Sequence, residues 1–339
     1  MVIKPEIHSP IYLNDTSNSL FQASGAGKDL TQGGINLHVL DNGKIQRAER
    51  FSPRIRTEDD LERIKAPQIY INSDKTENEY QRLGEIFGDI LQVKKGGISS
   101  IRFGPLDDLV RLWGVNEFFE DLYMRPELVH KAMGKMLDVN IQRLNQYEKL
   151  NILSLNNNLA GCMAGGMGET FTDELPGPSY DHLHVKPCNM WGNAEAQIFS
   201  CVSPEMHEEF ALHYEKKWLE RFGLVTYGCC EQLHEKVDIL SKIPNLRKIS
   251  MSCWIDVDRA VEKMGNKYVF SYKPNPAIFA AKDWNLDLAR DEIVNVLEKA
   301  KRHNCQVEII MRTILTFRGM PERLKEWTKM AMETVQSYS

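Results

Sequence analysis

Apolar and polar residues change their rhythm along the chain near residue 96. Beyond that point, short runs rich in β-branched and aromatic residues alternate with longer stretches whose apolar residues recur at helical spacing. The short runs predict strands and the longer stretches predict helices. The most regular part has four consecutive strand–helix units, with strands over 224–227, 246–251, 268–271 and 307–311 and helices over 235–243, 257–264, 288–302 and 321–335.

Earlier parts of the chain show the same alternation less regularly. Strands are predicted over 97–103 and 151–155, and helices over 126–144 and 203–223. Repeated strand–helix units require a parallel sheet covered by helices, because parallel strands need crossover connections. The sequence therefore predicts an α/β fold, a (β/α)8 TIM barrel over residues 96–339. The alternative is an open doubly wound sheet, but neither of its usual phosphate loops, GxGxxG or GxxxxGK[ST], occurs.

Residues 1–95 lack this periodicity and predict an irregular N-terminal extension that caps the barrel. The turn signal Asp41-Asn42-Gly43 lies between two short apolar runs and predicts a hairpin. The stretch Thr57-Glu-Asp-Asp-Leu predicts a short capped helix.

Charge and composition narrow the function classes. The 339 residues carry 42 Lys and Arg against 47 Asp and Glu, a net charge of −5, and no Lys/Arg-rich run. A nucleic acid or anionic membrane partner is therefore not expected. No apolar stretch is long enough for a membrane span, and the first residues lack the apolar block of a signal peptide, so the expected location is the cytoplasm. The seven cysteines include no CxxC pair and are expected to be reduced thiols.

Polar and reactive residues follow the predicted strands, where a barrel enzyme builds its site. Loops are polar in general, so any one of these residues has a structural explanation too. Five strands in succession are followed by such residues, which are Asn156 to Asn158, Cys229 to Glu231, Ser252 to Trp254, Lys273 to Pro276, and Arg312.

The segment from Tyr227 to His234 is chemically the richest, since thiolate, carboxylate and imidazole all bind zinc. Adjacent strand residues point to opposite faces, so Cys229 and Cys230 are not expected to share one ion. Cys230 is the candidate metal ligand and the expected inward thiol. Glu231 and His234 would equally suit a hydrogen bond at a helix start.

Asp173 lies in a long segment without periodicity that continues to His182 and His184. Such segments in compact domains often cover an active site. Acid–base chemistry and solvated loop charges remain open for this segment.

Four motifs resemble the uroporphyrinogen-decarboxylase-like superfamily, most closely its corrinoid-dependent methyltransferases, the methyl-transferring components of O-demethylase systems. They are Tyr227-Gly-Cys-Cys-Glu-Gln-Leu-His, Ile243-Pro-Asn-Leu-Arg-Lys-Ile-Ser, Lys273-Pro-Asn-Pro-Ala and Pro321-Glu-Arg-Leu-Lys-Glu-Trp. The resemblance runs from about Ile55 to the C-terminus and implies a (β/α)8 barrel.

The resemblance implies transfer of a methyl group from a methylated small molecule, such as a methoxylated aromatic, to the cobalt of a partner corrinoid protein. Glu231, Asp173 and zinc near Cys230 are the candidates for polarising the leaving atom. The expected substrate-binding residues are Asn158, Trp191, Tyr227, Lys273, Asn275 and Arg312.

The chain departs from the family at the zinc ligands. Where the family often has His-x-Cys, this chain has Tyr227-Gly228-Cys229, and Arg312-Thr313 stands at the place of the last cysteine. The arginine-rich motif of true decarboxylases is missing, so tetrapyrrole decarboxylation is the second hypothesis. A non-catalytic ligand-binding barrel is the third. The family also carries more sequence before the barrel, so a shortened start is expected, and a homodimer is a further expected partner.

Overall fold

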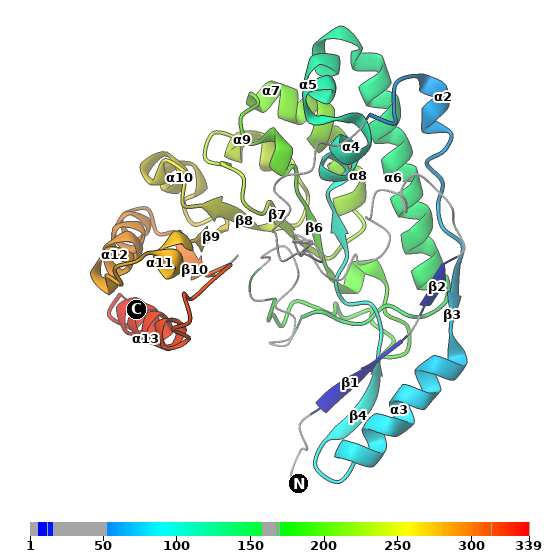
Figure 1. Cartoon of the computed structure of the whole chain (residues 1–339), viewed down its shortest axis with the longest axis horizontal. Coiled ribbons are helices and arrows are strands. Elements are labelled where there is room, and N and C mark those ends of the chain that lie inside the picture. Colours follow the sequence, from blue (N-terminus) through cyan, green and yellow to red (C-terminus); the bar gives the residue numbers. More distant parts are fainter. Residues whose placement is uncertain are drawn as a thin grey trace.

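The computed structural model describes residues 6–11, 13–15, 53–157, 168, 170–312 and 314–338. Its centre is a parallel sheet of six strands in the order β10-β9-β8-β7-β6-β5 (Figure 1). The strands are β5 (Arg102–Phe103), β6 (Trp191–Ala194), β7 (Leu224–Tyr227), β8 (Leu246–Ser252), β9 (Val269–Lys273) and β10 (Gln306–Ile309).

Each strand of this sheet lies beside the strand that precedes it in the chain. A doubly wound sheet reverses its strand order part-way, and these six strands have no such reversal. The predicted α/β fold with a parallel sheet is confirmed. The expected strand over 97–103 appears as β5 together with a parallel bridge between Ile98 and Leu153, the latter within the expected strand over 151–155.

Helices form an arc outside the strands (Figure 1). They are α4 (Pro105–Trp113), α5 (Val115–Met124), α6 (Pro126–Lys149), α7 (Pro204–His207), α8 (His213–Leu219), α9 (Val237–Leu240), α10 (Val257–Met264), α11 (Ala277–Ala280), α12 (Leu286–Arg302) and α13 (Glu322–Gln336). A π-helical segment, η4 (Glu208–Leu212), joins α7 to α8, and the 3-10 turns η2 (Pro187–Asn189) and η3 (Gln197–Phe199) flank β6.

Strand alternation places an apolar core between the sheet and these helices. Phe103 of β5 stacks on Trp218 of α8 with 5.2 Å between ring centroids. Ile249 and Met251 of β8 and Phe270 of β9 are completely buried in the same core. Because successive strand residues point to opposite faces, the residues between them point away from the helices.

The first part of the chain is more regular than the sequence predicts. In the segment expected to be irregular, β1 (Glu6–Pro10) pairs in parallel with β4 (Gln92–Gly96), and β2 (Leu13–Asp15) pairs antiparallel with β3 (Ile69–Ile71). Between β3 and β4 lies α3 (Ser73–Phe87), a helix of 15 residues. The expected helix appears as α2 (Glu58–Leu61), capped by Thr57. The expected hairpin near residue 42 lies outside the described residues.

In Figure 1, β1, β4 and α3 project from the sheet at lower right, whereas α12 and α13 lie at the left beside β10. Among the helices that the structure describes, none has the length and apolar character needed to cross a bilayer.

Candidate functional site

The sheet face that points away from the helices is polar and largely buried. Alternation puts Arg102 of β5, Asn193 of β6, Thr226 of β7 and Lys273 of β9 on this face, and all but Arg102 are at most 3% exposed. Lys248 of β8 also faces this way and pairs with Glu308 of β10 at 3.0 Å. Among the described residues, Asn193 Oδ1 and Thr226 Oγ1 are buried on this face without a hydrogen-bond partner. Such atoms are costly to bury, so they favour ligand binding at this face over packing alone.

Arg102 holds together the carboxylates beside the first strands. Its Nε lies 2.5 Å from Oε1 of Glu195, which follows β6, and its Nη2 lies 3.3 Å from Oδ2 of Asp107 on α4. Burial raises the pKa of Asp107 to about 6 despite Arg102, and burial with the nearby Cys229 and Glu231 raises the pKa of Glu195 well above its ordinary value. One guanidinium thus serves two carboxylates, and burial favours the protonated form of both.

Only one of the two carboxylate oxygens of Glu195 has a partner among the described residues. Its Oε1 receives Arg102 and an Nε2–H of Gln197 at 3.1 Å. Its Oε2 is buried and has no hydrogen-bond partner among the described residues. Both contacts lie on Oε1, so Oε2 is the oxygen that can carry a proton when Glu195 is protonated.

Glu231 has a structural task in this site. Its Oε1 accepts the N–H of Ala196 at 2.9 Å, and its Oε2 accepts the N–H of Cys229 at 2.5 Å. The side chain is completely buried and ties the loop after β6 to the loop after β7. Glu231 therefore lies between the loops that follow β6 and β7, and both of its oxygens accept backbone N–H groups.

The two cysteines after β7 lie side by side. Their Sγ atoms are 3.9 Å apart, and Arg312, which follows β10, donates an Nη1–H to Cys229 Sγ. The expectation that they point to opposite faces was wrong, because Gly228 has a φ of +91° and ends the strand geometry before them. Cys229, not Cys230, is the buried thiol, at 1% exposure, whereas Cys230 is exposed.

Positively charged side chains also lie at the carboxyl ends of the strands. Lys273, at the end of β9, is 3% exposed, and burial lowers its pKa to about 8 even though Cys229 favours the charged form. The hydrogen bond from Cys229, aided by Arg312, lowers the pKa of Cys230 to about 7. The carboxyl ends of β5 to β10 thus bring together predicted residues (Cys230, Glu231, Lys273 and Arg312) and unpredicted ones (Arg102, Asp107 and Glu195).

Asp173 and Trp191 lie at the opposite side of the sheet, where the strands begin. Leu175 packs on Trp191 and Leu224, the first residues of β6 and β7, and Glu174 binds Arg247 beside the start of β8. At about 3.3 Å per residue, the four-residue β7 puts roughly 10 Å between its two edges. The structure therefore does not bring Asp173 to Glu231. Trp191 is covered as well, with its Nε1–H bonded to the carbonyl of Thr170 at 2.9 Å.

Tyr227 and Asn275 also have structural roles. Tyr227 is completely buried and points toward the helices, where its hydroxyl donates to Glu215 Oε2 at 2.6 Å and contacts His207 Nε2 at 2.6 Å. Asn275 accepts the N–H of Ala277 at 3.0 Å and so shapes the start of α11. Asn158 lies outside the described residues.

The network behind Tyr227 is fully buried and continuous. Lys236 Nζ lies 3.1 Å from His207 Nδ1, and the other ring nitrogen of His207 contacts the Tyr227 hydroxyl, which donates to Glu215. The four side chains therefore form one hydrogen-bonded chain. Burial lowers the pKa of His207 to about 3 and that of Lys236 to about 8, and it raises the pKa of Glu215 to about 8.

A catalytic zinc needs three protein ligands. Cys229 and Cys230 supply two sulfurs. Arg312 stands in the sequence where the resemblance would place the third ligand, and it donates a hydrogen bond to Cys229. In the part of the chain that the structure describes, no three His, Cys, Asp or Glu side chains group in a way that could hold an ion. These residues do not fit the zinc site that the family resemblance implies.

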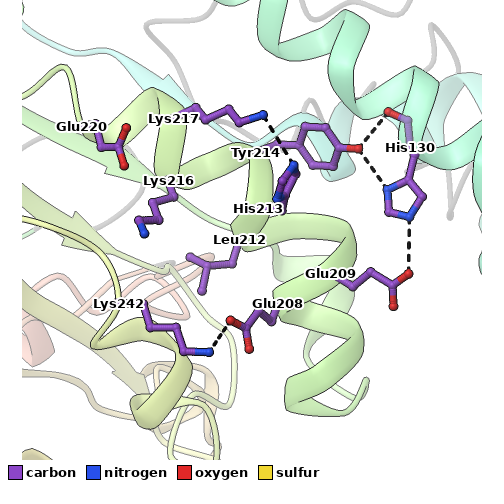
Figure 2. Close-up of a pocket in the computed structure, with 10 residues that line it drawn as sticks. All are labelled: His130, Glu208, Glu209, Leu212, His213, Tyr214, Lys216, Lys217, Glu220 and Lys242. Carbon is purple, nitrogen blue, oxygen red and sulfur yellow. Dashed lines mark hydrogen bonds and ion pairs between the residues drawn. The ribbon is translucent and has the colours of Figure 1, made fainter.

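A separate hollow of about 570 Å³ lies on the outer surface of the helices (Figure 2). His130 of α6 contacts Tyr214 at 2.9 Å and Glu209 at 3.4 Å there. Acidic and basic side chains alternate along its wall, and none of the predicted site residues lines it.

No protein-family model matches this chain, and no curated protein matches it either. The resemblance to the uroporphyrinogen-decarboxylase-like superfamily stays a prediction.

Proposed function

We propose that this chain is a methyltransferase that acts on a small methylated molecule at the carboxyl ends of its parallel strands. The observation that carries the proposal is the convergence of Arg102 with buried Glu195, Cys229 and Lys273 at the carboxyl ends of six adjacent strands. Active sites of α/β enzymes lie at this edge, because the loops that follow the strands meet there.

The strand order supports a (β/α)8 barrel as the scaffold. All six strands add in sequence to the same growing edge, as they must in a barrel. Asn156 adds a further segment, because its Nδ2 donates to the carbonyls of Ser99 at 3.0 Å and Trp191 at 2.9 Å. With the bridge between Ile98 and Leu153, these bonds bring the segment of Leu153 and Asn156 beside the start of the β5 segment and of β6, whereas β5 itself pairs directly with β6.

Arg312 and Lys273 suit the binding of an anionic group on the methyl donor. Both cations lie at the ends of neighbouring strands, and among the described residues Lys273 Nζ hydrogen-bonds Ser271, at 3.3 Å, and no carboxylate. Arg102, in contrast, is committed to Glu195 and Asp107. A carboxylate or phenolate on the donor would give Lys273 a charged partner.

Glu195 takes the polarising role that the sequence analysis assigned to Glu231. As the bond between the methyl carbon and its oxygen breaks, the electron pair stays on that oxygen, and the proton on Glu195 Oε2 neutralises it. When bound, the cobalt(I) of a partner corrinoid protein supplies the nucleophile for the methyl carbon. Arg102 then stabilises the carboxylate that Glu195 becomes.

The test is anaerobic incubation of the full chain with a reduced corrinoid protein and a panel of methoxylated benzoates, neutral methoxylated aromatics and methylamines. We expect a demethylated product, detected by mass spectrometry, from a donor that carries an anionic group, and only when the corrinoid protein is present. Binding of a donor without any product would support a ligand-binding barrel instead. Loss of carboxylates from uroporphyrinogen by the same protein would support the decarboxylase.

A further inference from the structure

The Cys229–Cys230 pair is unusual because neighbouring residues rarely present both side chains to one point. Gly228, at φ +91°, turns the chain so that the two Sγ atoms lie 3.9 Å apart. Hydrogen bonds hold this geometry from both sides of Cys229, whose N–H donates to Glu231 and whose carbonyl accepts from Ser250 at 2.5 Å.

We propose that Cys229 and Cys230 form a dithiol site for a neutral, thiophilic ligand of the trivalent arsenical class. Two As–S bonds to one pyramidal arsenic hold their sulfurs somewhat closer than non-bonded contact. The two Sγ atoms, 3.9 Å apart, need only a small further approach to reach that separation. A disulfide needs about 2.05 Å between sulfurs, and adjacent residues are closer at Cα than the usual range for disulfides.

The charges beside the pair favour a neutral ligand over a metal dication. Arg312 donates to Cys229 Sγ and Lys273 is buried nearby, while the carboxylates of Glu195 and Glu231 act on the same thiols, so charges of both signs already surround the pair and a neutral ligand adds none. A trivalent arsenical carries no net charge and takes only two thiols, which is the number of thiols that the pair offers. It therefore needs no third ligand from the protein.

The reaction conserves atoms and electrons. An arylarsine oxide, R–As=O, condenses with the two S–H groups to give R–As bonded to both sulfurs and one water molecule. Two S–H bonds and the As–O linkage break, two As–S bonds form, and no oxidant is needed. Cys230 is exposed and reacts first, after which the buried Cys229 closes the ring.

Among the described residues, the other free cysteines are single: Cys188 and Cys201 are exposed, and Cys253 and Cys305 are partly buried. A single thiol forms one bond to arsenic and releases it readily to a competing monothiol. The second bond at Cys229–Cys230 is intramolecular, which strengthens binding by roughly 10²–10⁴-fold.

The experiment is titration of the reduced full chain with phenylarsine oxide, followed by intact-mass spectrometry in the presence of excess 2-mercaptoethanol. We expect one adduct per chain that survives the monothiol and is removed by dithiothreitol. C230S should bind roughly 10²–10⁴-fold more weakly, whereas C201S, which removes an exposed single cysteine, should keep the adduct. Peptide mapping should find arsenic on the peptide that contains Cys229 and Cys230.

An adduct that persists in C230S, that bridges other cysteines, or that the monothiol removes from the unaltered chain would overturn the proposal. C230A, at the same exposed position, serves as a second variant, and circular dichroism checks that each variant folds. The binding readout does not depend on methyl transfer, so the dithiol proposal stands or falls apart from the proposed function.

Discussion

Two buried glutamates at the site edge differ in how many of their oxygens are already bonded. Both oxygens of Glu231 accept backbone N–H groups, which fixes the carboxylate as an acceptor between two loops. Glu195 has its donors on Oε1 and leaves Oε2 unbonded within the described part of the chain. At the scale of single residues, hydrogen-bond occupancy therefore separates the structural acid from the one that we propose as the proton donor.

Glu215 leads to a prediction about pH and stability. Burial raises its pKa from 4.5 to about 8, so between these pH values the folded chain binds a proton that the unfolded chain does not. Its contribution to stability is present below pH 4.5 and is lost as the pH rises through 8. We expect Glu215→Gln to remove a decline in the free energy of unfolding of at most about 1.4 kcal/mol per pH unit.

Urea unfolding of the unaltered chain and of Glu215→Gln at several pH values in this window measures the difference. Glu174→Gln is the matched control, because Glu174 is exposed and its pKa is lowered by Arg247, so it has no proton to lose there. Parallel pH profiles for the unaltered chain and Glu215→Gln would contradict the assignment.

Single residues of the site were predictable where they follow a recognisable strand. Lys273 and Arg312 were found by this rule, because their strands stand out in the sequence. Arg102 was hidden inside its own strand, and Glu195 follows β6, whose residues Trp191–Ala194 include glycine and asparagine and no β-branched side chain. The long gap between the expected strand at 151–155 and the strand at 224–227 was the available signal for β6.

At the scale of elements, the close approach of β6 to the helices depends on Gly192. A Cβ at this position would overlap ring atoms of Phe222, which is 1% exposed in the core. We expect Gly192→Ala to reduce the free energy of unfolding by about 1–3 kcal/mol, because the aromatic ring must move within a packed core.

The midpoint of urea unfolding tests this expectation. Gly177→Ala is the matched control, since a Cβ there has nothing within 4 Å, and its effect should stay within about 0.5 kcal/mol. Equal midpoints for the two variants would show that β6 does not pack on Phe222 as described.

Elements with strong periodicity were predicted closely, and those set by tertiary contacts were not. The strand over 224–227 and the helix over 257–264 have the predicted bounds. The helix expected over 235–243 extends only from Val237 to Leu240, and the one expected over 203–223 is interrupted by the π-helical segment η4. The helix α3 was missed although Tyr80, Leu83 and Phe87 recur at helical spacing, and in the structure Thr76 is its buried residue.

At the scale of the whole molecule, the strands are added to the sheet in one direction, so the carboxyl ends of all the strands lie at the same side of the sheet. The order β5 to β10 repeats the order of the chain, so each following loop lies beside the previous one. The segment of Asp173 to Leu175 precedes β6 and packs against the other edge. Variants at the two ends of the strands can therefore be compared within one molecule: the proposed reaction takes place at the carboxyl ends and not at the amino ends.

The most direct test of the proposed function measures demethylation rates, against pH, for the unaltered chain, Glu195→Gln and Asp173→Asn, with the active donor and reduced corrinoid protein. We expect Glu195→Gln to lower the rate by roughly 10²–10⁴-fold and to lose the decline in rate at high pH that deprotonation of Glu195 causes. Asp173→Asn should match the unaltered chain. A fully active Glu195→Gln, or an inactive Asp173→Asn that still folds, would contradict a reaction at the carboxyl ends of the strands.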